Sequence, residues 1–154
     1  MSEQVLSKQA LSDKEAKLAQ DLFDAYTSHK PLTEADYTGY ADSEDAAYRV
    51  QRRLTEDKKE EVGGYKVSLT SKQTQDMFDS DSPLYGAQVK SHFVKSPHNV
   101  KADEVMDPLA EVEMMFTAKE DLSANDSLED LFHKTTVAPA VEVPDSRFKD
   151  WFPS

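Results

Sequence analysis

The 154-residue sequence contains no cysteine and is short of basic side chains. Without cysteine there are no disulfide bonds, no thiolate metal site and no cysteine nucleophile. Aspartate and glutamate number 30 against 18 lysines and arginines, so the formal net charge is −12. Because binding to nucleic acid or to an anionic membrane requires basic surfaces, this balance argues against both kinds of partner.

Long hydrophobic stretches are also missing. No apolar run approaches the length of a membrane-spanning helix, and residues 1–6 lack the basic and apolar regions of a signal peptide. We therefore expect a cytoplasmic protein. With 38% hydrophobic and 31% charged residues, the chain has the composition of one ordinary domain and the length to build a core.

The N-terminal part of the chain predicts a helical segment, residues 1–62. Ser12 and Glu15 have capping-box spacing, and apolar residues recur at helical intervals over 12–29. Ser43 is placed to cap a second helix. Both helices are expected to be amphipathic and to pack against the rest of the domain.

The remaining residues, 63–154, predict a β-rich region that begins at two adjacent glycines. Strand patterns and short helical patterns alternate from there. Strands are expected near 65–70, 84–89, 109–118 and 136–143, and short helices near 71–78 and 127–133. Two helices followed by scattered strands indicate an α+β fold. The apolar pair Met114 and Met115 is expected in its core.

Two glutamates one residue apart, Glu111 and Glu113, and a third, Glu142, lie within apolar strand patterns. Side chains at i and i+2 share one face of a strand, so Glu111 and Glu113 point the same way. Neighbouring carboxylates in apolar surroundings require a compensating cation or protons. A hard divalent metal ion meets that need, and the alternative is an exposed strand face in an acidic protein.

Lys66 follows the glycine pair and shares a strand face with Ser68 and Thr70. In a polar cleft close to a metal ion, a lysine can have its pKa lowered enough for proton transfer. The alternative is a solvent-exposed residue at the edge of a sheet.

Five motifs occur in a characteristic order and spacing. They are DAAYRVQ at 45–51, GGYKVSLTS at 63–71, SPLYG at 82–86, EVE at 111–113 and APAVEVPDSR at 138–147. Together they resemble the 2-keto-4-pentenoate hydratase group of the fumarylacetoacetate hydrolase superfamily, a group that also contains 4-oxalocrotonate decarboxylases. The resemblance extends over nearly the whole chain, from the first helix to Trp151.

This resemblance implies a metal-dependent lyase. The fold would be N-terminal helices followed by part of a mixed β-roll of fumarylacetoacetase C-terminal-domain type. Glu111, Glu113 and Glu142 would bind Mg2+ or Mn2+, and Lys66 would handle protons. The substrate would be a small 2-oxo acid of aromatic catabolism, and the reaction would pass through a metal-stabilised enolate.

Three further residues are candidates for substrate contact: Ser68, Leu84 and Arg147. Arg147 could bind a substrate carboxylate or serve in a salt bridge. Hydratases of the group tend to carry an acidic residue at the position of Leu84, where it helps to activate water. Leucine cannot accept a proton, so this departure favours decarboxylation over hydration.

Family members continue well beyond the APAVEVPDSR motif, by roughly two-fifths of their length. We therefore expect a catalytic region whose C-terminal strands are missing, with exposed edges that favour association. A homo-oligomer or a complex with a full-length relative is the expected assembly. The competing hypothesis is a non-catalytic, truncated remnant that folds only with a partner or not at all.

Overall fold

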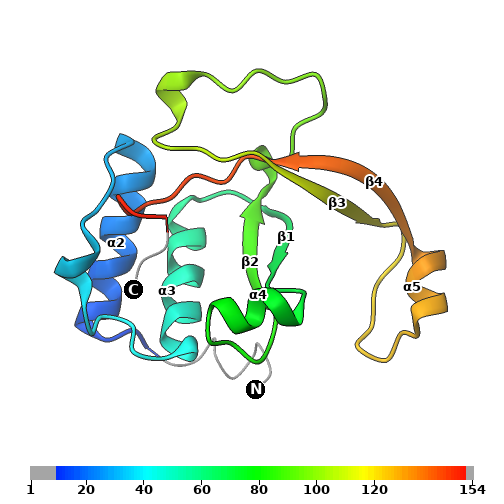
Figure 1. The fold of residues 1–154 in the computed structure, drawn as a ribbon, viewed down its shortest axis with the longest axis horizontal. Coiled ribbons are helices and arrows are strands. Elements are labelled where there is room, and N and C mark those ends of the chain that lie inside the picture. Colours follow the sequence, from blue (N-terminus) through cyan, green and yellow to red (C-terminus); the bar gives the residue numbers. More distant parts are fainter. Residues whose placement is uncertain (1–9, 152–154) are drawn as a thin grey trace.

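In the part of the chain that the structure describes, two long packed helices lie beside two antiparallel ribbons (Figure 1). The computed structural model describes residues 10–151. The helices are α2 (Asp13–Ser28), α3 (Glu44–Asp57), α4 (Lys72–Met77) and α5 (Leu128–Lys134). The short 3-10 helices are η1 (Glu34–Tyr37), η2 (Lys90–His92) and η3 (Ala102–Glu104), and the strands are β1 (Val62–Ser68), β2 (Leu84–Val89), β3 (Glu111–Ala118) and β4 (Thr135–Glu142). The predicted α+β class is confirmed.

Both long helices begin where the sequence predicts. The Ser12 hydroxyl accepts a hydrogen bond from the Glu15 backbone N–H, and the Glu15 carboxylate accepts one from the Ser12 N–H. This reciprocal pair forms the predicted capping box. The Ser43 hydroxyl accepts from the Ala46 N–H at the start of α3. At the start of each long helix, the cap therefore satisfies one backbone N–H that the helix would otherwise leave unpaired.

The core lies between α2 and α3 and includes a residue from the C-terminal part of the chain. Leu18, Ala19 and Val50 are buried there, and Phe148 packs against them. Backbone hydrogen bonds tie Leu32 to the residues on either side of Phe148. The C-terminal segment thus returns to the helices, and the division of the chain at residue 62 stays a prediction.

The first ribbon pairs β1 with β2 in antiparallel register. Lys66 lies opposite Gly86, and Ser68 lies opposite Leu84. Helix α3 lies beside this ribbon (Figure 1), with the ring of Tyr48 stacked on that of Tyr85 at a centroid distance of 4.8 Å. This packing fixes the ribbon that carries Lys66 against the helical core.

The second ribbon pairs β3 with β4, and helix α5 lies at its far end (Figure 1). Val112 pairs with Val141, Met114 with Pro139, and Phe116 with Val137. Because directly opposed residues share a face, these six side chains form one apolar face, opposite the face that carries the glutamates.

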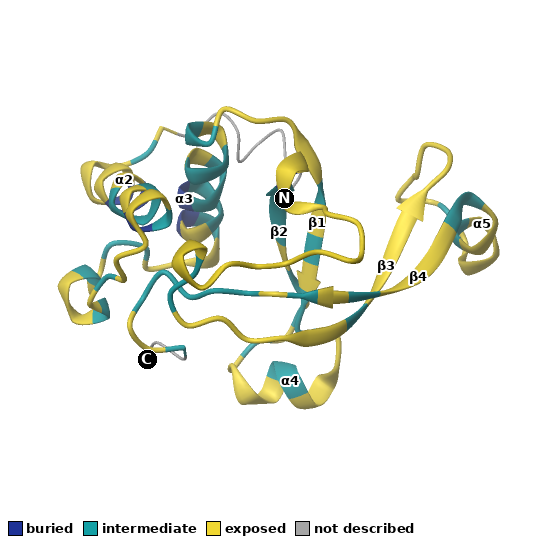
Figure 2. Ribbon diagram, turned by 90° about the horizontal axis from the view of Figure 1, so that it is seen from above, coloured by how far each residue is buried: buried dark blue, intermediate teal, exposed yellow. Residues whose placement is uncertain are grey.

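This apolar face is exposed, as Figure 2 shows for most of the second ribbon. The residue exposures are 89% for Val112, 67% for Met114 and 59% for Phe116. Met115, at 37%, is also outside the buried core. The expectation that Met114 and Met115 lie in the core is therefore wrong. Met114 lies on the outer face of a ribbon that projects away from the helices, and nothing within residues 10–151 covers that face. Met115 lies on the opposite face and is itself partly exposed. Within the same residues, no helix is long and apolar enough to cross a membrane.

Candidate metal centre

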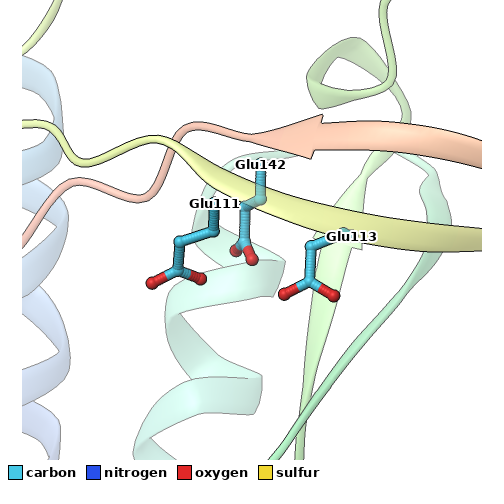
Figure 3. Close-up of side chains that lie close together, drawn as sticks. All are labelled: Glu111, Glu113 and Glu142. Carbon is cyan, nitrogen blue, oxygen red and sulfur yellow. The ribbon is translucent and has the colours of Figure 1, made fainter.

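The register of the second ribbon brings the three predicted glutamates together. Glu111 at the start of β3 lies directly opposite Glu142 at the end of β4, and Glu113 follows two residues along on the same face. All three carboxylates point to the same side of the ribbon (Figure 3). One oxygen from each lies within 4.8 Å of the others. The side chains are partly exposed, so a small ion has access from solvent.

A loop after β4 fastens this end of the ribbon. The Asp145 carboxylate accepts hydrogen bonds from the backbone N–H groups of Met106 and Asp107, the shortest at 2.8 Å. The Leu109 N–H donates to the Pro144 carbonyl, which extends the strand pairing beyond Glu111 and Glu142. Sequence reasoning missed this role of Asp145, although its position directly after Pro144 is typical of a residue that binds neighbouring backbone groups.

Lys66 reaches the carboxylates from the first ribbon. Its Nζ lies 2.7 Å from Glu113 Oε1 and 3.6 Å from Glu111 Oε2, and it donates a hydrogen bond to Glu142. A single ammonium group therefore contacts all three carboxylates and joins the two ribbons. The family resemblance implies that Lys66 acts together with the glutamates, and the structure places these four side chains in contact.

The electrostatics at Lys66 differ from the sequence expectation. Partial burial disfavours the ammonium form and lowers the pKa of Lys66, but hydrogen bonds to Glu113 and Glu142 and the charges of those carboxylates act more strongly in the opposite direction. The pKa of Lys66 is therefore raised above its ordinary value. The expected lowering assumed a metal cation near the lysine, whereas here the lysine itself is the positive charge among the carboxylates.

The donor set fits a hard divalent cation. Three carboxylates offer oxygen ligands, which suit Mg2+ and Mn2+, whereas a zinc site would be expected to include histidine or cysteine. A cation held by one oxygen from each glutamate keeps coordination positions open for water or substrate. These three residues could therefore hold the implied metal ion.

Two of the three candidate substrate residues lie beside Lys66. Ser68 is on the same face of β1 as Lys66, and Leu84 is directly opposite Ser68 on β2. Arg147 has other contacts: its guanidinium pairs with Asp145 at 3.2 Å and stacks over the Tyr26 ring at 5.0 Å. The salt-bridge alternative is therefore present at Arg147, and its contact with substrate stays a prediction.

Sequence comparison finds hydratases. The chain is 37% identical over 103 residues to a 2-hydroxyhexa-2,4-dienoate hydratase of Comamonas testosteroni, an alignment covering 64% of this chain and 39% of the relative. It is 30% identical over 141 residues to a 2-keto-4-pentenoate hydratase of Burkholderia vietnamiensis, covering 88% of this chain and 54% of the relative. No family model matches the sequence.

Among solved structures, 4-oxalocrotonate decarboxylase from Pseudomonas putida G7, complexed with magnesium and adipate, matches with a TM-score of 0.79 at 24% identity. The alignment covers 94% of this chain and 57% of that one. The chain belongs to the 2-keto-4-pentenoate hydratase and 4-oxalocrotonate decarboxylase group. It spans about half the length of the group members that it matches.

Membership in this group agrees with the α+β fold, with helices preceding antiparallel strands. A second structure of the same decarboxylase, complexed with calcium and acetate, also matches with a TM-score of 0.79. The magnesium and the calcium in these two structures are bound to that protein, not to this chain. The group's enzymes act on small molecules, and its members include both hydratases and decarboxylases.

Proposed function

We propose that this chain carries the metal-binding and proton-transfer residues of a lyase that acts on a 2-oxo acid. Glu111, Glu113 and Glu142 would bind Mg2+ or Mn2+, and Lys66 would exchange a proton with the carbon skeleton of the substrate. The convergence of three carboxylates and one lysine from three different strands carries this proposal.

The bound cation would act as a Lewis acid toward the 2-oxo group and favour the enolate character of the transition state. The chain's own residues supply the rest. The glutamates would hold the cation, and with it the substrate's chelating end, close to Lys66, whose amine would protonate or deprotonate carbon as enol and keto forms exchange. Ser68, on the same face, offers a hydroxyl for a substrate oxygen.

Hydration and decarboxylation share the enolate and differ in whether water adds or CO2 leaves. In our proposal, Leu84, which lies opposite Ser68, decides between hydration and decarboxylation. Leu84 cannot take a proton from water, and its apolar side chain disfavours a positioned water molecule at that point. Similarity to curated hydratases supports hydration, whereas Leu84 and the fold of the decarboxylase structures support decarboxylation. A 2-oxo acid is the substrate class in both cases.

The assembly of the active protein is part of the proposal. The exposed apolar face of β3 and β4 favours association, with a second copy or with a longer member of the group. The alternative of a non-catalytic remnant is not favoured, because the four ionisable side chains of the proposed site still converge in this chain.

Thermal unfolding with and without millimolar Mg2+ or Mn2+ tests the metal site. An ion that binds only the folded chain raises its melting temperature by mass action. The shift should be present in wild type and in Glu120→Gln, which removes one charge at the far end of the ribbon, and lost in Glu113→Gln. Equal shifts in all three proteins would contradict the proposed ligands.

Turnover is tested separately by incubating the chain with an unsaturated 2-oxo acid and Mg2+. Proton NMR detects a hydrated product, and measurement of released CO2 detects decarboxylation. Either a hydrated product or CO2, abolished in Lys66→Met, would support the proposed lyase. A metal-shifted chain that converts no 2-oxo acid would contradict the lyase and leave a metal-binding protein.

A further inference from the structure

The Lys66 ammonium occupies the space among the three carboxylates. It contacts Glu142 and lies 2.7 Å from Glu113 and 3.6 Å from Glu111. Three carboxylates and one ammonium leave a formal charge of −2 in the cluster. That is the charge that one divalent cation neutralises, so the cluster keeps a need for a cation even with Lys66 in place.

We propose that Lys66 is the resident cation of this cluster, and that a divalent ion binds by displacing its ammonium group from the carboxylates. This inference rests on the proposed metal site and adds the order of events: binding of the ion frees the lysine. Metal binding and the availability of Lys66 for substrate are then one coupled step.

Competition follows from the geometry. An ammonium and a divalent cation seek the same carboxylate oxygens, and two cations that share those oxygens at contact distance repel each other strongly. One of them must withdraw. The lysine can do so, because its long flexible stem starts on the other ribbon and its side chain is 24% exposed. It would remain on the face that carries Ser68 and Leu84.

The coupling has a functional consequence. While Lys66 is tied to three carboxylates, its amine is held by these partners and is not available to a substrate. Once displaced, it lies beside a bound cation and on the face proposed to contact substrate. The chain thereby keeps its proton-handling residue engaged until the cation that orients the substrate has bound.

Calorimetric titration with Mg2+ tests the displacement. Lys66→Met removes the competing charge, and Lys66→Gln removes it while keeping hydrogen-bond donors for the carboxylates. Both variants should bind Mg2+ at least about tenfold more tightly than wild type, since the ion no longer has to move a positive charge from a few ångströms away. The matched control is Lys90→Met, which removes an exposed lysine with Glu61 as its partner at 3.3 Å and should bind as wild type does.

Melting temperatures give a second readout. Without metal, Lys66→Met and Lys66→Gln should melt lower than wild type, because the carboxylates lose their counter-charge. At saturating Mg2+ this difference should close or reverse. The melting temperature of Lys90→Met should stay close to that of wild type both without metal and at saturating Mg2+.

Equal or weaker Mg2+ binding by folded Lys66→Gln, with wild type binding normally, would overturn the displacement while leaving the metal site intact. Failure of every variant and of wild type to bind Mg2+ would overturn both. Tighter binding by the two Lys66 variants in a chain without lyase turnover would support the displacement and contradict the proposed reaction.

Discussion

Glu111 and Glu142 lie directly opposite each other on β3 and β4, two carboxylates in one cross-strand pair. Like charges in this position destabilise a ribbon. Strand pairing alone therefore disfavours this pair of glutamates, and the ammonium of Lys66 offsets part of the repulsion between their carboxylates.

Removal of one of these charges should stabilise the metal-free chain. Glu111 is the carboxylate farthest from Lys66, so Glu111→Gln loses little attraction and relieves the repulsion with Glu142. We expect a gain of about 0.2–1 kcal/mol in the free energy of unfolding, measured by urea titration without metal. Glu120→Gln changes net charge equally and should have a smaller effect. A loss of stability in Glu111→Gln would show that attraction to Lys66 dominates.

The ion pair between Glu15 and Arg49 should matter more than the surface pairs. Glu15 is 4% exposed, and its carboxylate accepts a hydrogen bond from Arg49 at 2.5 Å. Arg49→Met leaves a buried carboxylate without its main partner, at a cost of about 3 kcal/mol in unfolding free energy at neutral pH. Arg53→Met removes an exposed pair from the same helix and should cost far less.

This ion pair also predicts a pH dependence. The hydrogen bond from Arg49 lowers the pKa of Glu15 below its ordinary value, and burial opposes this only in part. A carboxylate with a lowered folded pKa contributes stability above its unfolded pKa, near 4.5, and loses it as pH falls through the folded value. The difference between wild type and Arg49→Met should therefore shrink in acid. A difference that stays constant from pH 7 to pH 3 would contradict the pairing.

Gly63 should tolerate no larger residue. A Cβ at this position would lie 2.7 Å from the Lys90 Cα, a backbone atom that cannot move without shifting the turn after β2. Gly63→Ala should lower the free energy of unfolding by about 1–3 kcal/mol. Gly86→Ala is the matched control, because its nearest neighbour is the Gln51 side-chain nitrogen at 3.6 Å. Equal losses in both variants would refute the steric explanation.

Leu84 should set the balance between the two reactions. Leu84→Asp places a carboxylate opposite Ser68, where it can accept a proton from water. We expect hydration of a 2-oxo acid to increase and release of CO2 to decrease, measured on the same sample. Val67→Asp adds the same charge to the opposite face of the ribbon and should leave the ratio unchanged. An unchanged ratio in Leu84→Asp would contradict the role given to this position.

Local order was determined by the sequence. Ser12 with Glu15, and Ser43, identify the starts of both long helices, because a cap is made by groups within a few residues of each other. The i, i+2 spacing of Glu111 and Glu113 places both on one face for the same reason. The strands at 84–89 and near 111–118 also follow from local alternation.

Tertiary structure alone decided which distant residues meet. Lys66 is 47 residues from Glu113 and 76 from Glu142, and their contact depends on the register of two ribbons and on how the ribbons lie relative to each other. No local pattern encodes that placement. The exposure of Met114 and Phe116 likewise could not be predicted from the sequence, because alternating apolar residues identify one face of a strand but not whether another element covers that face. The pKa of Lys66 is raised, whereas a lowered pKa was expected, for a similar reason. The charge around Lys66 is the sum over side chains that only the folded chain brings together.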